Sequence, residues 1–188
     1  KLALKIYRNL CSNEKLIVKL SKHLSKFLQV FMDKSSSNRE EILDILSEFG
    51  RFDDYRKVMI ENGVTSCALE ALKSGSTTAC DFIITMSSNL NFFDEILELK
   101  IYEILLYRIV SEEDGNRENF LTAFHKLIDL RGISQLIEIS TEISSKLSKI
   151  LKSPPPFSTS FALISIFEKL SLYGEVKERI SSNKDLAG

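Results

Sequence analysis

The sequence predicts an all-α protein built as a solenoid, in which one helical unit recurs along the chain. Three observations lead to this fold class. Apolar residues recur at steps of three and four along most of the chain, and no segment has the two-residue period of a strand. Glycine is rare, yet Gly63 and Gly75 close two consecutive amphipathic segments. The same order of segments then recurs at intervals near forty residues, which is typical of helical repeat proteins.

The stretch around the two glycines shows what one unit contains. Residues 52–62 and 64–74 carry apolar side chains at helical spacing, so they predict two amphipathic helices rather than the strands of a hairpin. Gly63 is expected to end the first helix in the left-handed conformation, and Gly75 to end the second likewise. Upstream, residues 39–49 predict a longer helix that a further glycine ends. One longer helix is therefore expected to precede two shorter ones.

Five segments match the longer helix of this unit. They cover residues 2–13, 39–51, 77–89, 119–132 and 160–174. When their ends are aligned, five apolar residues fall in register at spacings of 39, 37, 41 and 43: Leu10, Phe49, Met86, Leu127 and Leu170. Pairs of shorter helices are predicted at residues 14–22 with 23–34, 52–63 with 64–75, 91–100 with 101–112, and 132–140 with 142–153. The proline cluster at 154–156 is expected to end the last pair.

These segments define approximate repeat units within a single solenoid. The units cover residues 1–13, 14–50, 51–89, 90–131 and 132–188. The first unit reads as a third helix without the two helices before it, and residues 175–188 read as a first helix without successors. Terminal repeats of a free solenoid need polar outer faces, yet the first helix is rich in leucine and isoleucine. We therefore expect a segment of a longer solenoid, or ends that other chains cover.

Composition and charge argue against binding to nucleic acid or insertion into a membrane. The chain carries 25 basic and 26 acidic side chains, a formal net charge of -1, and 44% apolar residues. No uncharged apolar run approaches the ~20 residues of a membrane span, and the amino-terminal residues are too charged for a signal peptide. Cys11, Cys67 and Cys80 lie within apolar helical patterns, so we expect reduced thiols and a cytoplasmic protein, with the nucleus as the alternative.

No motif predicts an enzyme, a cofactor or a metal site. His23 and His125 lie far apart, and the spacings typical of zinc ligands are missing from the sequence. His125 is expected to line a surface or satisfy a hydrogen bond. The serines lack the surroundings of a nucleophile elbow or a phosphate loop. Two basic amphipathic segments, residues 21–31 and 142–153, are expected to be solvated outer faces, with an acidic partner or anionic lipid as the alternative.

Two stretches of the chain resemble the armadillo repeat family. Residues 8–13, RNLCSN, look like the end of the third helix of such a repeat. Residues 52–76 are similar to the segment that follows there, in which a first helix, a glycine turn and a second helix lead to the next third helix. The resemblance covers essentially the whole chain. It implies a right-handed α-solenoid of about four to five armadillo-like three-helix repeats, with a concave groove that binds extended or helical protein segments.

The same resemblance implies which residues line the groove. In the family, an asparagine of the third helix commonly hydrogen-bonds the backbone of a bound peptide, and Asn9 matches it. The aligned positions in the later repeats carry other residues, and the chain has no tryptophan. In both respects the sequence departs from importin-alpha-like proteins, which recognise basic nuclear-localisation peptides. Each third helix is expected to present two residues four apart on one face. These candidate site residues are Lys5 and Asn9, Asp44 and Glu48, Asp81 and Thr85, Thr122 and Lys126, and Ser165 and Lys169.

The groove is expected to be acidic in its middle and basic toward its carboxyl end. Five third helices ~10 Å apart would span roughly 40 Å, enough for about 12 extended residues of a protein partner with mixed charge. The predicted function is a non-catalytic scaffold for protein–protein interaction. The alternative is a co-chaperone, myosin-chaperone-like or Hsp70 exchange-factor-like, which would use the same fold.

Overall fold

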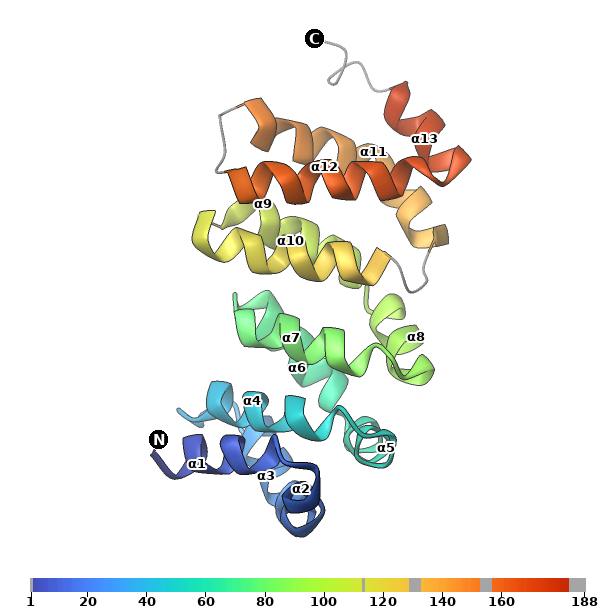
Figure 1. Ribbon diagram of the computed structural model, residues 1–188. Helices are drawn as coiled ribbons and strands as arrows, with labels where there is room; N and C mark the ends of the chain where they lie inside the picture. Colours follow the sequence, from blue (N-terminus) through green and yellow to red (C-terminus); the bar gives the residue numbers. More distant parts are fainter. Residues whose placement is uncertain (1, 113, 129–132, 153–156, 183–188) are drawn as a thin grey trace. The chain divides into compact units, whose positions relative to one another are not determined.

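The computed structural model describes residues 2–112, 114–128, 133–152 and 157–182 (Figure 1). Within these ranges the chain folds into thirteen α-helices and one short 3-10 helix, and none of it forms a β-strand. The all-α fold predicted from the apolar periodicity is therefore confirmed. The helices form two compact units, residues 1–96 and 97–188.

In the amino-terminal unit the predicted third helices lie side by side. Its elements are α1 (Leu2–Cys11), α2 (Glu14–Leu20), η1 (Ser21–His23), α3 (Leu24–Met32), α4 (Arg39–Phe49), α5 (Asp53–Glu61), α6 (Val64–Lys73), α7 (Thr77–Met86) and most of α8 (Leu90–Glu98). α1 packs on α4, and α4 packs on α7. The second helices follow the same order, since α3 contacts α4 and α6, and α6 contacts α7.

The carboxy-terminal unit repeats this arrangement with longer helices. Its elements are α9 (Ile101–Ser111), α10 (Asp114–Ile128), α11 (Ile133–Lys152), α12 (Phe157–Ser171) and α13 (Gly174–Ser181). The third helices α10 and α12 pack together, and α9 lies against both α10 and α11. α13 contacts α11 and α12. It therefore follows α12 as a first helix follows a third helix elsewhere in the chain.

Burial follows the predicted register of the third helices. Four of the five aligned residues are fully buried, namely Phe49, Met86, Leu127 and Leu170. The residues one turn before them are buried as well, namely Ile45, Phe82, Ala123 and Ile166. Residues four apart lie on one face of a helix, so this face belongs to the apolar core of each unit. Full burial of a large side chain there contributes about 1.5–3 kcal/mol.

Left-handed residues lie in three of the tight turns between consecutive helices. Gly63, with φ 73° and ψ 26°, separates α5 from α6, which confirms the predicted cap, and Gly75 has a φ of 96°. Lys100, with φ 60°, takes the equivalent place between α8 and α9. Gly50 ends α4 for a different reason. A Cβ atom there would lie 3.0 Å from the sulfur of Met86, so glycine lets α4 approach α7 closely.

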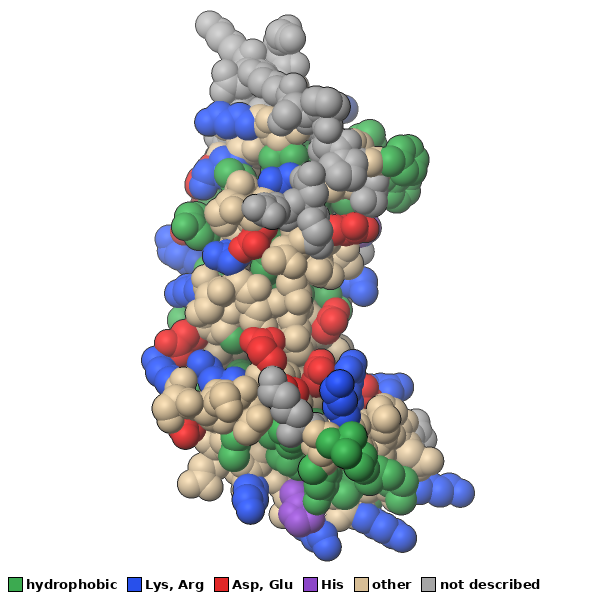
Figure 2. Space-filling view, turned by 90° about the vertical axis from the view of Figure 1, so that its left-hand side faces the viewer, with side chains coloured by type: hydrophobic (Ala, Val, Ile, Leu, Met, Phe, Trp, Pro, Cys, Tyr) green, Lys and Arg blue, Asp and Glu red, His purple; other side chains and the backbone are tan. Residues whose placement is uncertain are grey.

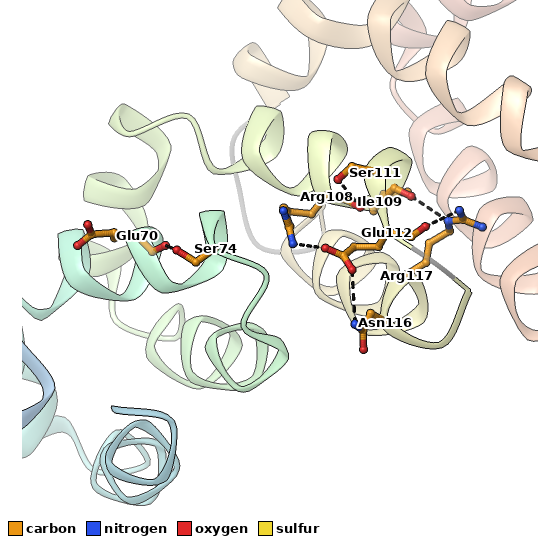
Figure 3. A network of polar contacts seen from close by, with 8 residues as sticks. All are labelled: Glu70, Ser74, Arg108, Ile109, Ser111, Glu112, Asn116 and Arg117. Carbon is orange, nitrogen blue, oxygen red and sulfur yellow. Dashed lines mark hydrogen bonds and ion pairs between the residues drawn. The ribbon is translucent and has the colours of Figure 1, made fainter. Parts of the chain in front are cut away.

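One arginine in each unit joins the start of a third helix to the end of the helix before it. Arg39 donates through Nε to the carbonyl of Phe31, near the end of α3, at 2.9 Å. Arg117 donates in the same way to the carbonyl of Ile109, near the end of α9, also at 2.9 Å (Figure 3). The last carbonyls of a helix lack donors within the helix. The two arginines supply these donors. In both units the arginine lies eight residues after the residue whose carbonyl accepts its hydrogen bond.

One prediction about the helices is wrong. The predicted break near residue 141 does not exist, because α11 is one helix of 20 residues. Glycine and proline are missing from residues 133–152, and the hydroxyl of Ser140 donates to the carbonyl of Ile137 at 2.8 Å within the helix. The predicted difference in length is small in the amino-terminal unit: α1 and α4, with 10 and 11 residues, are each longer than the two α-helices that follow them, but α7 has the same 10 residues as α6.

The boundaries of the repeats and the extent of the solenoid stay predictions, as does its right-handed superhelix. α1 and α13 have the positions expected of the partial units at residues 1–13 and 175–188. The proline cluster at 154–156 lies outside the described residues, as do residues 183–188.

Candidate functional site

The candidate residues of the amino-terminal unit lie on three adjacent helices and none is buried. They are Lys5 and Asn9 on α1, Asp44 and Glu48 on α4, and Asp81 and Thr85 on α7. By contrast, their sequence neighbours Ile45 and Phe82 are fully buried. Because α1, α4 and α7 pack in that order, the structure brings the three pairs together on the solvent side of one helical layer.

Asp44 lies among several charged groups of this layer. The guanidinium of Arg8, on α1, lies 3.3 Å from its carboxylate. Burial raises the pKa of Asp44, and Arg8 opposes that effect, while the negative charges of Asp81, Glu40 and Glu41 raise the pKa further. The net result is a pKa above the ordinary value. Additional positive charge beside Asp44 would therefore be electrostatically favourable.

The neighbouring acidic side chains already make some polar contacts. Glu40 accepts a hydrogen bond from the hydroxyl of Ser76 at 2.8 Å, and Glu48 pairs with Arg51 at 3.2 Å. Asn9 is exposed, and its side chain has no hydrogen-bond partner within the described residues. Figure 2 shows acidic side chains (red) gathered in the lower half of that view, over the amino-terminal unit, with basic side chains (blue) beside them.

In the carboxy-terminal unit the candidate residues lie on α10 and α12. The hydroxyl of Ser165 lies 2.8 Å from Nε2 of His125, and Nζ of Lys169 donates to the carbonyl of His125 at 3.4 Å. Thr122 and Lys126 are exposed on α10. His125 therefore makes a hydrogen bond between two third helices, which is one of the roles that the sequence predicts for it.

The contacts between third helices use the same register positions in both units. Arg8 and His125 each lie two residues before the aligned leucine of their helix, and their partners Asp44 and Ser165 each lie five residues before the aligned residue of the next. Sequence reasoning missed Arg8 and Glu40 because it considered only the positions one and five residues before the aligned one. The register itself could have found them.

The structure thus brings the candidate residues together within each unit. A continuous groove across all five third helices, with room for about 12 residues of a partner, stays a prediction.

Within the described ranges, no group of three or more histidine, cysteine, aspartate or glutamate side chains is arranged to hold a metal ion. Over the same ranges, no helix combines the length and apolar character needed to cross a bilayer. All three cysteines are free thiols; Cys11 and Cys80 are buried and Cys67 is half-buried.

Third helices that pack on one another in each unit, with further helices between successive ones, define an α-helical repeat protein. Comparison with solved structures shows that this repeat fold is armadillo-like. A designed armadillo repeat protein matches with a TM-score of 0.77 and 16% identity, over 97% of this chain and 81% of that chain. A structure of computationally designed armadillo repeat proteins for modular peptide recognition matches with a TM-score of 0.76 and 17% identity, over 98% and 82%.

A third match is a designed armadillo repeat protein in complex with the peptide (KR)4. Its TM-score is 0.78 at 18% identity, over 98% of this chain and 81% of that chain. At such low identity these likenesses show the fold alone. No family model matches the chain, and no curated protein matches its sequence.

Proposed function

We propose that the protein is a non-catalytic scaffold for protein–protein interaction, which binds a segment of its partner along the third-helix face. One observation carries this proposal. The three adjacent helices α1, α4 and α7 present polar or charged pairs in register on the solvent side, while on α4 and α7 the apolar residues beside those pairs form the core. Side chains repeated at one register position of neighbouring helices can contact successive residues of a bound segment. A designed protein with this fold in complex with a peptide supports a role in binding peptide segments.

The charges of the candidate residues favour a partner segment that carries both basic and acidic side chains. On the amino-terminal unit, Asp44 and Asp81 would contact basic side chains, because their mutual repulsion falls when a cation binds between them. On the carboxy-terminal unit, Lys126 and Lys169 would favour acidic side chains. Asn9 is available to hydrogen-bond a peptide backbone. A cytoplasmic or nuclear location is part of this proposal, and the three free thiols support it.

The two functions predicted from the sequence differ in their expected activities. A scaffold binds a segment of a folded partner, an Hsp70 exchange factor speeds nucleotide release, and a myosin chaperone suppresses aggregation of a motor domain. None of the three matched structures described above is a co-chaperone, so the co-chaperone function remains the alternative.

Reversing the charge of the α4 pair is expected to weaken binding of a basic peptide with little effect on folding. Asp44→Lys with Glu48→Lys should weaken binding of the peptide (KR)4 at least tenfold, or ~1.4 kcal/mol, measured by calorimetry at low salt. The melting temperature should change little, because the two half-buried carboxylates only pair with exposed arginines, and such pairs contribute only about 0–1 kcal/mol to stability.

The matched control reverses two exposed carboxylates on another helix. Asp54→Lys with Glu61→Lys on α5 changes the net charge equally but leaves the third-helix face intact. This control should weaken binding much less. Equal losses in the two variants would mean that net charge alone attracts the peptide. Unchanged affinity in the α4 variant would place the binding site on another surface.

Removing Arg8 is expected to strengthen the same interaction. The guanidinium of Arg8 pairs with the carboxylate of Asp44, so the basic groups of a peptide must compete with Arg8 for that carboxylate. Arg8→Gln should tighten binding of (KR)4 by about two- to fivefold, since pairs at this degree of exposure contribute only about 0.2–1 kcal/mol. Weaker binding in this variant, measured by the same calorimetry, would show that Arg8 does not compete with basic groups of the peptide at this site.

A further inference from the structure

Arg56 occupies a core position of the first helix α5. Its backbone amide donates to the carbonyl of Phe52, the residue before the helix, at 3.0 Å. Ile17 of α2 and Phe93 of α8 make the equivalent backbone bond, also at 3.0 Å, and both side chains are fully buried. Arg56 is itself only 9% exposed. A charged side chain is therefore buried where the first helices α2 and α8 bury an apolar one.

The polar contacts of Arg56 leave part of its guanidinium unused. Nη1 donates to the carbonyl of Gly50 at 2.9 Å and to the hydroxyl of Ser88 at 2.7 Å, and Nη2 donates to the carboxylate of Asp53. Nε is buried and has no partner within the described residues. Burial of a cation is costly unless the cation is paired and fully hydrogen-bonded. Because the side chain of Asp53 is 74% exposed, it pairs only weakly with this cation, which can bind a further anionic group.

Ser88 places an exposed hydroxyl beside this guanidinium. It lies in the turn between α7 and α8, and its hydroxyl also donates to the carbonyl of Thr85 at 3.1 Å. The adjacent Ser87 is 3% exposed, and its hydroxyl donates to the carbonyl of Ile83 at 2.6 Å. Of the two neighbouring serines, Ser88 is therefore the one that is both accessible to an enzyme and bonded to Arg56.

A phosphate on Ser88 would supply the acceptors and the charge that Arg56 lacks. Phosphoserine carries a charge of about −1.5 to −2 at neutral pH and three acceptor oxygens. The free Nε and the second hydrogen of Nη2 can donate to these oxygens. Arg56 already stabilises one negative charge, because its hydrogen bond and its positive charge lower the pKa of Asp53. Phosphorylation removes the hydrogen that Ser88 donates to Thr85, but bonds between guanidinium and phosphate are stronger than that neutral bond.

We propose that Ser88 is a phosphorylation site and that the buried guanidinium of Arg56 binds the phosphate. An ATP-dependent protein kinase supplies the phosphoryl group. Oγ of Ser88 forms a bond to the γ-phosphorus, the bond from that phosphorus to the β–γ bridging oxygen breaks, and ADP leaves. The hydroxyl proton passes to a base of the kinase. The phosphate then joins the end of α7 to α5 through a charge-assisted contact.

Titration of phosphoserine incorporated at position 88, followed by phosphorus NMR, tests the contact with Arg56. The second pKa of phosphoserine is ordinarily about 6. In the folded protein this pKa should be about one unit lower, because Arg56 favours the doubly charged form. The same protein unfolded in urea should show the ordinary value. Equal pKa values in the folded and the unfolded protein would overturn the proposal.

Arg56→Leu in the same phosphorylated chain is the matched control. Leucine resembles the apolar residues that α2 and α8 carry at this position, so the variant should stay folded, which circular dichroism checks. The pKa of its phosphate should return to the ordinary value. An equally low pKa in this variant would show that another group binds the phosphate.

Phosphorylation should also raise the melting temperature at about pH 7.5. A phosphate whose pKa is lowered on folding stabilises the folded state above about pH 6 and loses that contribution as the pH falls. The gain should therefore shrink at about pH 4.5 and be absent in Arg56→Leu. A gain of the same size in that variant would contradict the contact.

Mass spectrometry of the protein isolated from its own cells, with phosphatase inhibitors present, tests the modification itself. Phosphate should be found on Ser88 and be missing from Ser87, whose hydroxyl is buried. Ser88→Ala expressed in the same cells should lack this phosphate. Absence of phosphate from Ser88, or its presence on other residues only, would overturn the assignment of the site.

Discussion

Phe124→Ala is expected to lower the free energy of unfolding by about 3–5 kcal/mol. Phe124 lies on α10, is fully buried, and packs edge to face against Tyr102 with ring centroids 5.5 Å apart. The hydroxyl of Tyr102 donates in turn to the carbonyl of Leu127 at 3.0 Å. Truncation removes the aromatic contact and leaves a cavity between α9 and α10. Urea unfolding followed by circular dichroism measures the change.

The same substitution at an exposed phenylalanine provides the control. Phe161→Ala on α12 removes an equal volume from a side chain that is 66% exposed, so the free energy of unfolding should change by less than about 1 kcal/mol. Equal losses in the two variants would contradict the packing described for α10.

The three cysteines are expected to react with iodoacetamide at widely different rates. Burial, together with the nearby charge of Asp81, raises the pKa of Cys80 to about 12. Burial and the charge of Glu48 raise the pKa of Cys11 to about 11. At pH 8 a thiol with a pKa near 12 has about a thousandfold less thiolate than one at the ordinary value of 9.0, and the thiolate is the reactive form. Half-buried Cys67 should therefore be modified first.

Peptide mass spectrometry of the alkylated protein checks this order. Cys67→Ser should eliminate the fast reaction and leave two slow thiols, whereas addition of urea should make all the cysteines react at similar rates. Rapid modification of Cys80 in the folded protein would contradict its burial. The raised pKa values also predict that stability falls above about pH 9. In that range the unfolded chain loses thiol protons that the folded chain retains, so ionisation favours unfolding.

The helices and their register could be predicted from the sequence because the information is local. Apolar residues at helical spacing define the buried face of each third helix, and the five aligned residues from Leu10 to Leu170 identified it correctly in every later repeat. Gly63 indicated its turn because a left-handed residue favours glycine. At Lys100 the sequence predicted the break between α8 and α9, but not that a lysine would adopt the left-handed conformation there. Local reasoning failed at Ser140, because serine is compatible with both a turn and a helix.

The residues of the candidate site could likewise be predicted from the sequence. Once the aligned residues are known, helical periodicity places the residues one and five positions before each of them on the solvent side. Only the tertiary structure showed that Arg8 forms an ion pair with Asp44 and that Ser165 forms a hydrogen bond with His125. These partners are 36 and 40 residues apart in the chain. Helical periodicity relates residues within one helix, whereas a contact between helices depends on which side chains the packing of two helices brings within hydrogen-bonding distance.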